Sequence, residues 1–166
     1  MNLITDVLPA LALGMNKGNT NIMQRHPLKH NNIISPKHWQ AIITYAIVLT
    51  ACIFSSYAYC IAYLDFNKLL VNNMLFWSLA LAQLWHSFNL SKGYIFIFKN
   101  EVFQNKYVWF ALIICLLVMI ATYYLIPLRL VFKLVQLNFF QLGIVLVTSI
   151  LPVIIIQVFK KVKFVI

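Results

Sequence analysis

Long runs of apolar residues, separated by short polar or basic stretches, make up most of this sequence. Four of these runs contain no Asp, Glu, Lys or Arg, and they lie at residues 39–64, 69–91, 107–128 and 134–159. Each is long enough to cross a bilayer as a helix, which takes about 20 residues. The linkers between the runs are short, so neighbouring helices are expected to be antiparallel. The pattern predicts an all-α polytopic membrane protein with four full transmembrane helices in an antiparallel bundle.

Residues 1–13 form a shorter apolar stretch. A helix of this length covers about 20 Å, whereas the hydrocarbon core of a bilayer is about 30 Å thick. The stretch is therefore predicted to be a partial transmembrane helix, and a start inside the bilayer suggests truncation. The expected organisation is this partial helix, a cytoplasmic loop at 14–38 and a four-helix transmembrane domain at 39–166. Ser35 and Pro36 are typical of a helix start just before that domain.

The partial helix carries three polar residues, Asn2, Thr5 and Asp6, whose spacings of three and four place them on one helix face. Pro9 has no N–H, so the carbonyl of Thr5 loses its usual helical partner. A carboxylate, an amide, a hydroxyl and a freed carbonyl are the hard oxygen donors that calcium prefers. Polar groups inside a membrane helix commonly mark an ion pathway. The alternative is helix packing, with Asp6 neutralised by a proton or by a Lys from elsewhere.

Composition and charge are those of a membrane protein. Hydrophobic residues make up 63% of the chain, which has three acidic residues and a net charge of +10. The basic residues fall between apolar runs, which indicates solvated flanks beside a lipid bilayer, and no nucleic-acid partner is expected. Ten of them lie in segments 17–37, 92–106 and 160–163, against three on the other side, which predicts a cytoplasmic C-terminus. The three cysteines lie inside apolar runs and are expected to be buried thiols.

The stretch from residue 2 to residue 29 resembles the sixth membrane helix and the following cytoplasmic loop of P-type cation-transporting ATPases of the calcium-pump branch. The family pattern runs Asn-Leu-(Val/Ile)-Thr-Asp-Gly-Leu-Pro-Ala-x-Ala-Leu-Gly and later (Asp)-Ile-Met-x-Arg-Pro-Pro-(Arg/Lys). Three positions depart from it, since Val7 replaces a Gly, Asn21 an Asp and His26 a Pro. The matching positions are Asn2, Thr5, Asp6, Leu8, Pro9, Ala10, Ala12, Leu13, Gly14, Ile22, Met23, Arg25, Pro27 and Lys29.

A second resemblance lies in the run at 69–91, where Gln83, His86 and Asn89 follow the Gln/Glu-x-x-His/Asn-x-x-Asn pattern of the eighth helix of the same family. Calcium pumps with two ion sites have a Glu at the position of Gln83. A neutral amide there favours a single divalent ion, as in the secretory-pathway-like branch. The alternative for all three residues is interhelical hydrogen bonding near the cytoplasmic end. A metal-ligand role for His86 is discounted, because no Cys, Asp, Glu or second His lies within a turn.

The resemblance implies the C-terminal membrane domain of a calcium-type P-type ATPase, with Asn2, Thr5, Asp6 and Gln83 contributing part of the metal site. The transported ion is then calcium or a similar cation. No cofactor is expected in this chain, and Mg-ATP belongs only to the complete enzyme. The chain contains no Asp-Lys-Thr-Gly-Thr motif and no nucleotide-binding domain, so it is not expected to be active alone.

The implied partner is the missing N-terminal portion of the pump, from the same gene or as a separate chain, in which case this chain is a split subunit. The expected location is the plasma or inner membrane, as a multi-pass protein. A non-catalytic small membrane scaffold, or a remnant of a pump, is the other reading. A neighbouring gene that carries the phosphorylation motif distinguishes the two.

Overall fold

The computed structural model describes residues 2–15, 36–90 and 101–162, and for residues 2–6, 37 and 101 it describes the backbone alone. Every regular element in these described residues is a helix, which confirms the all-α prediction. The elements are α1 (Asn2–Gly14), α2 (Pro36–Ala62), α3 (Lys68–His86), the 3-10 helix η2 (Ser87–Leu90), α4 (Glu101–Gln104), α5 (Lys106–Tyr124), α6 (Ile126–Val131) and α7 (Phe139–Lys161). Ser35, the expected N-cap, and most of the predicted loop at 14–38 lie outside the described residues.

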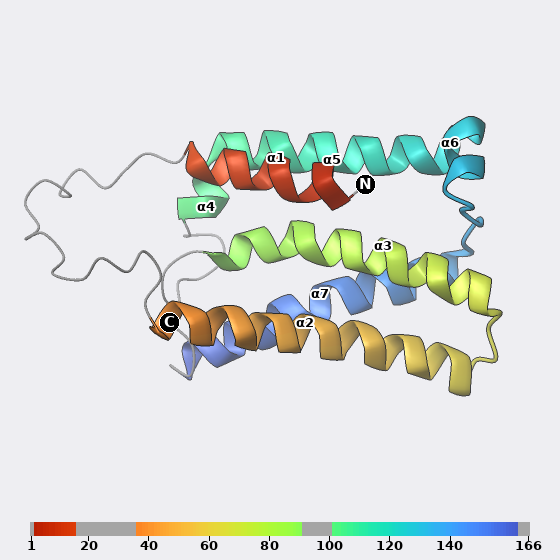
Figure 1. Cartoon of the computed structure of the whole chain (residues 1–166), viewed down its shortest axis with the longest axis horizontal. Helices are drawn as coiled ribbons and strands as arrows, with labels where there is room; N and C mark the ends of the chain where they lie inside the picture. The colour runs from red at the N-terminus through yellow and green to blue at the C-terminus, as the bar shows by residue number, and fades with distance from the viewer. Residues whose placement is uncertain (1, 16–35, 91–100, 163–166) are drawn as a thin grey trace, which may run out of the picture.

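The helix α3 lies in the middle of the bundle. It packs against α2 and α7 on one side and against α1 on the other, and α1 in turn packs against α5 (Figure 1). The successive long helices α2, α3, α5 and α7 alternate in direction, as the short linkers predict (Figure 1). The C-terminal ends of α1 and α7, the segment η2, and the starts of α2 and α5 all lie at one end of the bundle (Figure 1). We call this the η2 end.

Three helices are long and apolar enough to cross a membrane, and they cover His38–Ala62, Lys106–Tyr124 and Phe139–Lys161. The fourth expected span, at 69–91, is helical in α3 and continues in η2. Polar residues of α3, including Asn72, Asn73 and Gln83, lower its mean hydropathy, so that its role as a fourth full span stays a prediction.

Two expected helix ends differ from the structure, and local chemistry explains both. The run at 107–128 is divided, because α5 ends before Pro127 and a short helix, α6, begins with that proline in its first turn. Proline cannot donate to the carbonyl four residues earlier, but its fixed φ suits a helix start. The last helix begins at Phe139, not at residue 134. Asn138 precedes it, and its N–H donates to Oε1 of Gln141 at 2.8 Å, half of a capping box.

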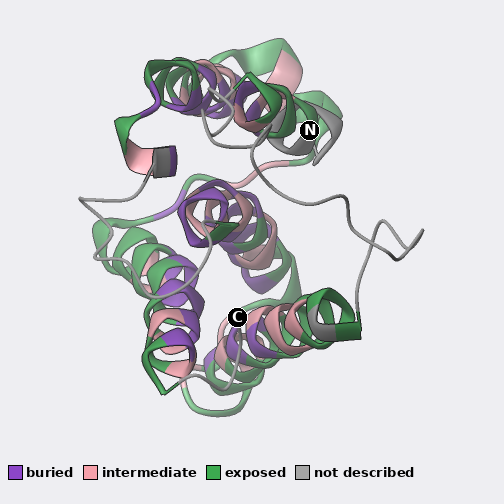
Figure 2. Cartoon of the chain, turned by 90° about the vertical axis from the view of Figure 1, so that its left-hand side faces the viewer, coloured by how far each residue is buried: buried purple, intermediate pink, exposed green. Residues whose placement is uncertain are grey.

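Buried residues lie on the faces of the helices that are turned toward the interior of the bundle, and residues on the outward faces are exposed (Figure 2). Many exposed residues are large and apolar, among them Phe54, Phe110, Leu117 and Ile154, as expected for a surface that contacts lipid. The cysteines Cys52, Cys60 and Cys115 are buried thiols, as predicted.

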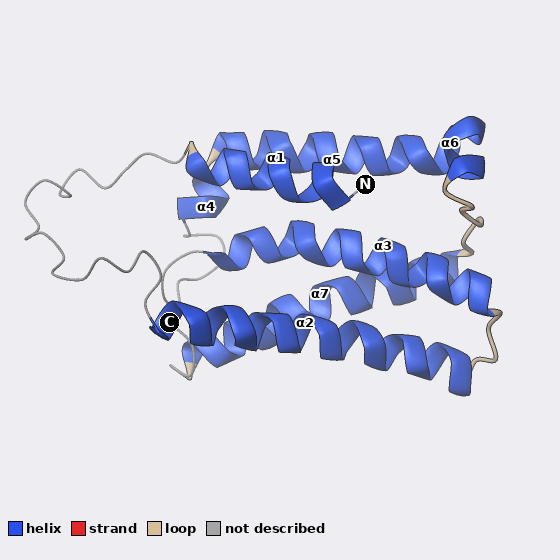
Figure 3. Cartoon of the chain, viewed as in Figure 1, coloured by secondary structure: helices blue, strands red, loops and turns tan. Residues whose placement is uncertain are grey.

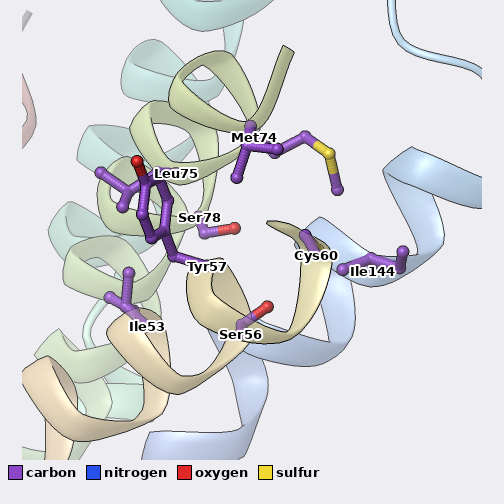
Figure 4. A pocket seen from close by; sticks show the side chains of 9 residues that line it. Ile53, Ser56, Tyr57, Cys60, Met74, Leu75, Ser78 and Ile144 are labelled. Carbon is purple, nitrogen blue, oxygen red and sulfur yellow. The ribbon is translucent and has the colours of Figure 1, made fainter. Parts of the chain in front are cut away.

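The junction of α2, α3 and α7 contains a small cavity. A cavity lined by Ser56, Cys60 and Ser78, among others, has a volume of about 10 Å³ (Figure 4). That volume holds roughly one water molecule. Beside it, the Oγ atom of Ser78 hydrogen-bonds Oγ1 of Thr148 on α7 at 2.9 Å, within buried surroundings. This small cavity therefore lies within an interface between helices and has room for no more than about one water molecule.

Candidate cation site

The helix α1 carries three of the four predicted ligands. It spans Asn2–Gly14 with Pro9 in its interior, close to the partial helix predicted at 1–13. The backbone places Asn2, Thr5 and Asp6 on successive turns before Pro9, so the helical spacing assumed for them is present. Their side chains lie outside the described part of the structure, and their role as ligands stays a prediction.

The C-terminal half of α1 is held between α5 and α3. Pro9 and Ala12 are buried. Ala12 belongs to the same hydrophobic cluster as Val108 of α5 and as Ala80 and Leu84 of α3. Gln83 lies on the same helix, three residues after Ala80 and three residues before His86, so its spacing places it between the faces of these two residues. The packing therefore brings α1, which carries Asn2, Thr5 and Asp6, next to α3, which carries Gln83.

Gln83 has a polar atom that nothing in the described part of the chain satisfies. Its Oε1 is fully buried and has no hydrogen-bond partner there. A buried carbonyl-type oxygen without a partner costs about 1–3 kcal/mol. Such an oxygen is an acceptor only, so a cation or an N–H or O–H donor from outside the described residues would stabilise it.

His86 is directed toward a different helix. Its ring meets the edge of the Tyr45 ring of α2, with ring centroids 5.2 Å apart and an angle of 75° between the planes. The helix α2 lies on the opposite side of α3 from α1 (Figure 1). The His86 ring thus contacts α2, and its Nδ1 is also buried without a partner among the described residues.

Asn89 is a packing residue, which confirms for this position the interhelical hydrogen bonding considered from the sequence. It is fully buried. Its Oδ1 accepts from Nε2 of Gln157 at 2.6 Å, and its Nδ2 donates to the carbonyl of Val153 at 3.4 Å. Its backbone carbonyl accepts from Nζ of Lys160. All three partners belong to α7, so Asn89 joins the end of α3 to the end of α7.

Lys160 is placed differently from what charge counting suggests. The positive-inside count treats it as one of the solvated residues of the C-terminal tail. In the structure Lys160 is only 3% exposed, and its Nζ lies 5.8 Å from the centroid of the Tyr45 ring. The sequence feature that could have indicated this inward position is the spacing of Lys160 from Gln157, which puts both residues on one face of α7.

No group of three His, Cys, Asp or Glu side chains gathers anywhere in the described residues.

Comparisons with known proteins show the family to which this sequence is similar. The sequence model of the family "Cation transporting ATPase, C-terminus" matches residues 1–162. The chain is 28% identical over 178 aligned residues to "Calcium-transporting ATPase 1" of Bacillus cereus (strain ATCC 10987 / NRS 248), an alignment that covers 98% of this chain and 20% of that protein. It is 30% identical over 142 residues to "Calcium-transporting ATPase" of Bacillus subtilis (strain 168), which covers 83% of this chain and 16% of that protein.

Proposed function

The chain belongs to the family of C-terminal domains of cation-transporting ATPases, and we propose that it is the membrane module of a P-type pump that transports calcium. In this proposal Asn2, Thr5, Asp6 and Gln83 supply part of the cation site, and the packed helices α2, α3, α5 and α7 support the helix α1. The names of both Bacillus relatives support calcium as the transported ion.

The observation that carries the proposal is the buried, unpartnered Oε1 of Gln83 on a helix that packs against α1. An oxygen acceptor in a low-dielectric interior is stabilised by a positive charge. Asp6 adds the one carboxylate of the predicted membrane helices, since Asp65 and Glu101 lie at helix ends. One carboxylate and several neutral oxygens do not neutralise a divalent ion. A further acidic ligand must then come from outside these residues.

The chain spans 20% and 16% of the lengths of the two Bacillus relatives. ATP hydrolysis is therefore proposed for a further portion of the pump, which is encoded in the same gene or as a separate chain. We propose that the η2 end faces the cytoplasm, where that portion would lie, and that the module resides in the plasma or inner membrane. The ten-to-three distribution of basic residues supports this orientation.

A chimeric pump tests the proposal. This chain replaces the matching segment of the Bacillus cereus ATPase, and calcium-dependent phosphorylation by ATP and calcium uptake into vesicles are measured. Asp6→Asn should abolish both activities, because a hard cation loses its charged ligand. Gln83→Ala, which removes one neutral oxygen, should reduce them least, with the alanine variants of Asn2 and Thr5 in between.

The matched control is Gln136→Ala, which removes the same amide from an exposed position between α6 and α7 and should leave both activities unchanged. Normal transport by the Asp6→Asn chimera would contradict the site assignment and leave the three polar residues of α1 as packing groups. A parent chimera that reaches the membrane, is monodisperse in detergent and still shows no calcium-dependent phosphorylation would favour the scaffold or remnant reading.

A further inference from the structure

Asn105 makes two hydrogen bonds that join different helices. It stands directly before α5, and its Oδ1 accepts from the backbone N–H of Tyr107 at 2.9 Å, which caps the helix. Its Nδ2 donates to the backbone carbonyl of Ala12, on α1, at 3.2 Å. The side chain is only 9% exposed. One amide group therefore satisfies the start of α5 and the end of α1 together.

The carbonyl of Ala12 needs such a partner. The last four carbonyls of a helix have no helical N–H to accept from. In α1, the N–H of Met15 donates to the carbonyl of Leu11 at 3.1 Å. Ala12 is itself buried, and within the described residues its carbonyl accepts from Asn105, which lies 93 residues later in the chain. In an apolar environment each unsatisfied backbone group costs several kcal/mol.

Capping alone does not require an asparagine at this position. Ser, Asp and Asn cap a helix about equally well. Asn67, which precedes α3, makes the same type of cap, with its Oδ1 accepting from the N–H of Leu69 at 3.1 Å, but it is exposed. Its amide makes no hydrogen bond to a second helix within the described residues. The feature that distinguishes Asn105 is therefore its Nδ2 group, which donates to the carbonyl of Ala12. An Asp side chain has no N–H to donate, and a Ser side chain is too short to reach this carbonyl.

We infer that Asn105 is a positioning residue that sets the axial position and rotation of α1 against α5, and through α1 the placement of Asp6 and Thr5. The inference rests on the proposed cation site. A slip of α1 by one residue moves it about 1.5 Å and turns it by about 100°, which would direct its ligands away from the neighbouring helix. Pro9 lies between the anchored turn and the ligand turns and removes one stabilising hydrogen bond of the helix. The anchor after Pro9 therefore limits how far α1 can shift.

Hydrogen exchange on the full chain in lipid nanodiscs tests the bond itself. The main variant is Asn105→Ser, which keeps a capping hydroxyl and loses the reach to Ala12. We expect the amides of residues 10–15 to exchange about five- to tenfold faster, as loss of one hydrogen bond predicts. The matched control, Asn67→Ser, should leave exchange in α1 unchanged. Asn105→Asp keeps the size and the cap but turns an acceptor toward the carbonyl of Ala12, so its effect should exceed that of Ser.

Calcium titration of the Bacillus cereus chimera tests the consequence. Asn105→Ser should raise the calcium concentration for half-maximal phosphorylation about fivefold, the factor expected for one lost hydrogen bond, and leave the maximal level almost unchanged. A residue that only maintains folding would lower the maximal level without this shift. Unchanged exchange in α1 for either Asn105 variant overturns the inference. Faster exchange without a calcium shift, in a chimera that Asp6→Asn inactivates, overturns it as well.

The two assays separate the inference from the proposed function. Normal transport by the Asp6→Asn chimera would overturn the cation site. Faster exchange in the Asn105→Ser chain would then still support the bond between α5 and α1. A response of both assays in the expected direction supports the inference and the proposed function together.

Discussion

The hydrogen bond between Asn89 and Gln157 offers a quantitative test of how α3 is attached to α7. The two side chains approach to 2.6 Å, and Asn89 is fully buried. Asn89→Ala removes this acceptor, removes the donor to the carbonyl of Val153, and leaves the Gln157 amide without a partner. Gln157→Ala removes one donor and leaves the Oδ1 of Asn89 unpaired. Each single change therefore includes the cost of an orphaned group, whereas the double change loses the same hydrogen bond once and leaves neither group of the pair orphaned.

The size of the effect follows from these contacts. Each hydrogen bond contributes about 1 kcal/mol net, and a buried group left unsatisfied costs about 1–3 kcal/mol. Asn89→Ala should thus lower the free energy of unfolding by about 2–4 kcal/mol, and Gln157→Ala by about 1–2 kcal/mol because its side chain is only half-buried. Interhelical hydrogen bonds in membrane proteins give coupling energies of about 0.6 kcal/mol on average and about 1.7 at most. The free energy of unfolding should fall less in the double variant than the sum of its decreases in the two single variants, and the difference should lie in this range.

The assay is unfolding of the full chain in mixed micelles with increasing SDS, followed by the loss of helical circular dichroism. The control cycle combines Gln157→Ala with Ser78→Ala. Ser78 bonds Thr148 further along α7, shares no partner with Gln157, and should therefore act additively. Independent sites are additive to within about 0.3–0.5 kcal/mol. A coupling energy between Asn89 and Gln157 no larger than this would refute a direct bond between α3 and α7 through these two side chains.

Three further outcomes are expected. Asn73 donates to the carbonyls of Leu69 and Lys133 and accepts from the N–H of Val135. In the same SDS titration, Asn73→Ala should therefore lower the free energy of unfolding by about 2–3 kcal/mol. The control, Asn72→Ala at an exposed position, should have almost no effect. The purified chain should form no acid-stable phosphoenzyme with radiolabelled ATP, since it has no Asp-Lys-Thr-Gly-Thr motif; stable labelling would contradict this expectation. A C-terminal reporter that is active only in the cytoplasm should give a signal, and activity of a reporter that works only outside would reverse the proposed orientation.

The sequence predicts the helices well because their signals are local. Uncharged apolar runs give α2, α5 and α7, and capping residues or prolines set most of their ends. The division between α5 and α6 at Pro127 was not predicted. It follows from a local rule about proline, but the apolar run continues through this break and the hydrophobic pattern does not reveal it.

The rotation of each helix could not be predicted in the same way. Between Val108 and Ala121, α5 is apolar around its whole circumference, so no stripe marks its buried face. The inward position of Lys160 and the bond from Asn105 to Ala12 both depend on such rotations. The cap that Asn105 makes on α5 is a local contact, but its second partner lies 93 residues away and becomes evident only when α1 and α5 are packed together.

Two groups of polar side chains in the bundle differ in how they are satisfied. Ser78, Asn89 and Asn105 have partners on another helix, and these bonds account for their presence in an apolar setting. The buried polar atoms without partners among the described residues are the indole nitrogens of two tryptophans, Nδ1 of His86 and Oε1 of Gln83.

The chemistry of the second group singles out Gln83. An indole nitrogen is only a donor and cannot bind a cation. His86 stacks against α2, on the side of α3 away from α1. The amide oxygen of Gln83 is an acceptor on a helix that contacts α1. Of the unpartnered atoms it is thus the oxygen acceptor, the chemistry that a hard cation prefers, and this is why Gln83, although neutral, is retained as a proposed ligand together with Asp6.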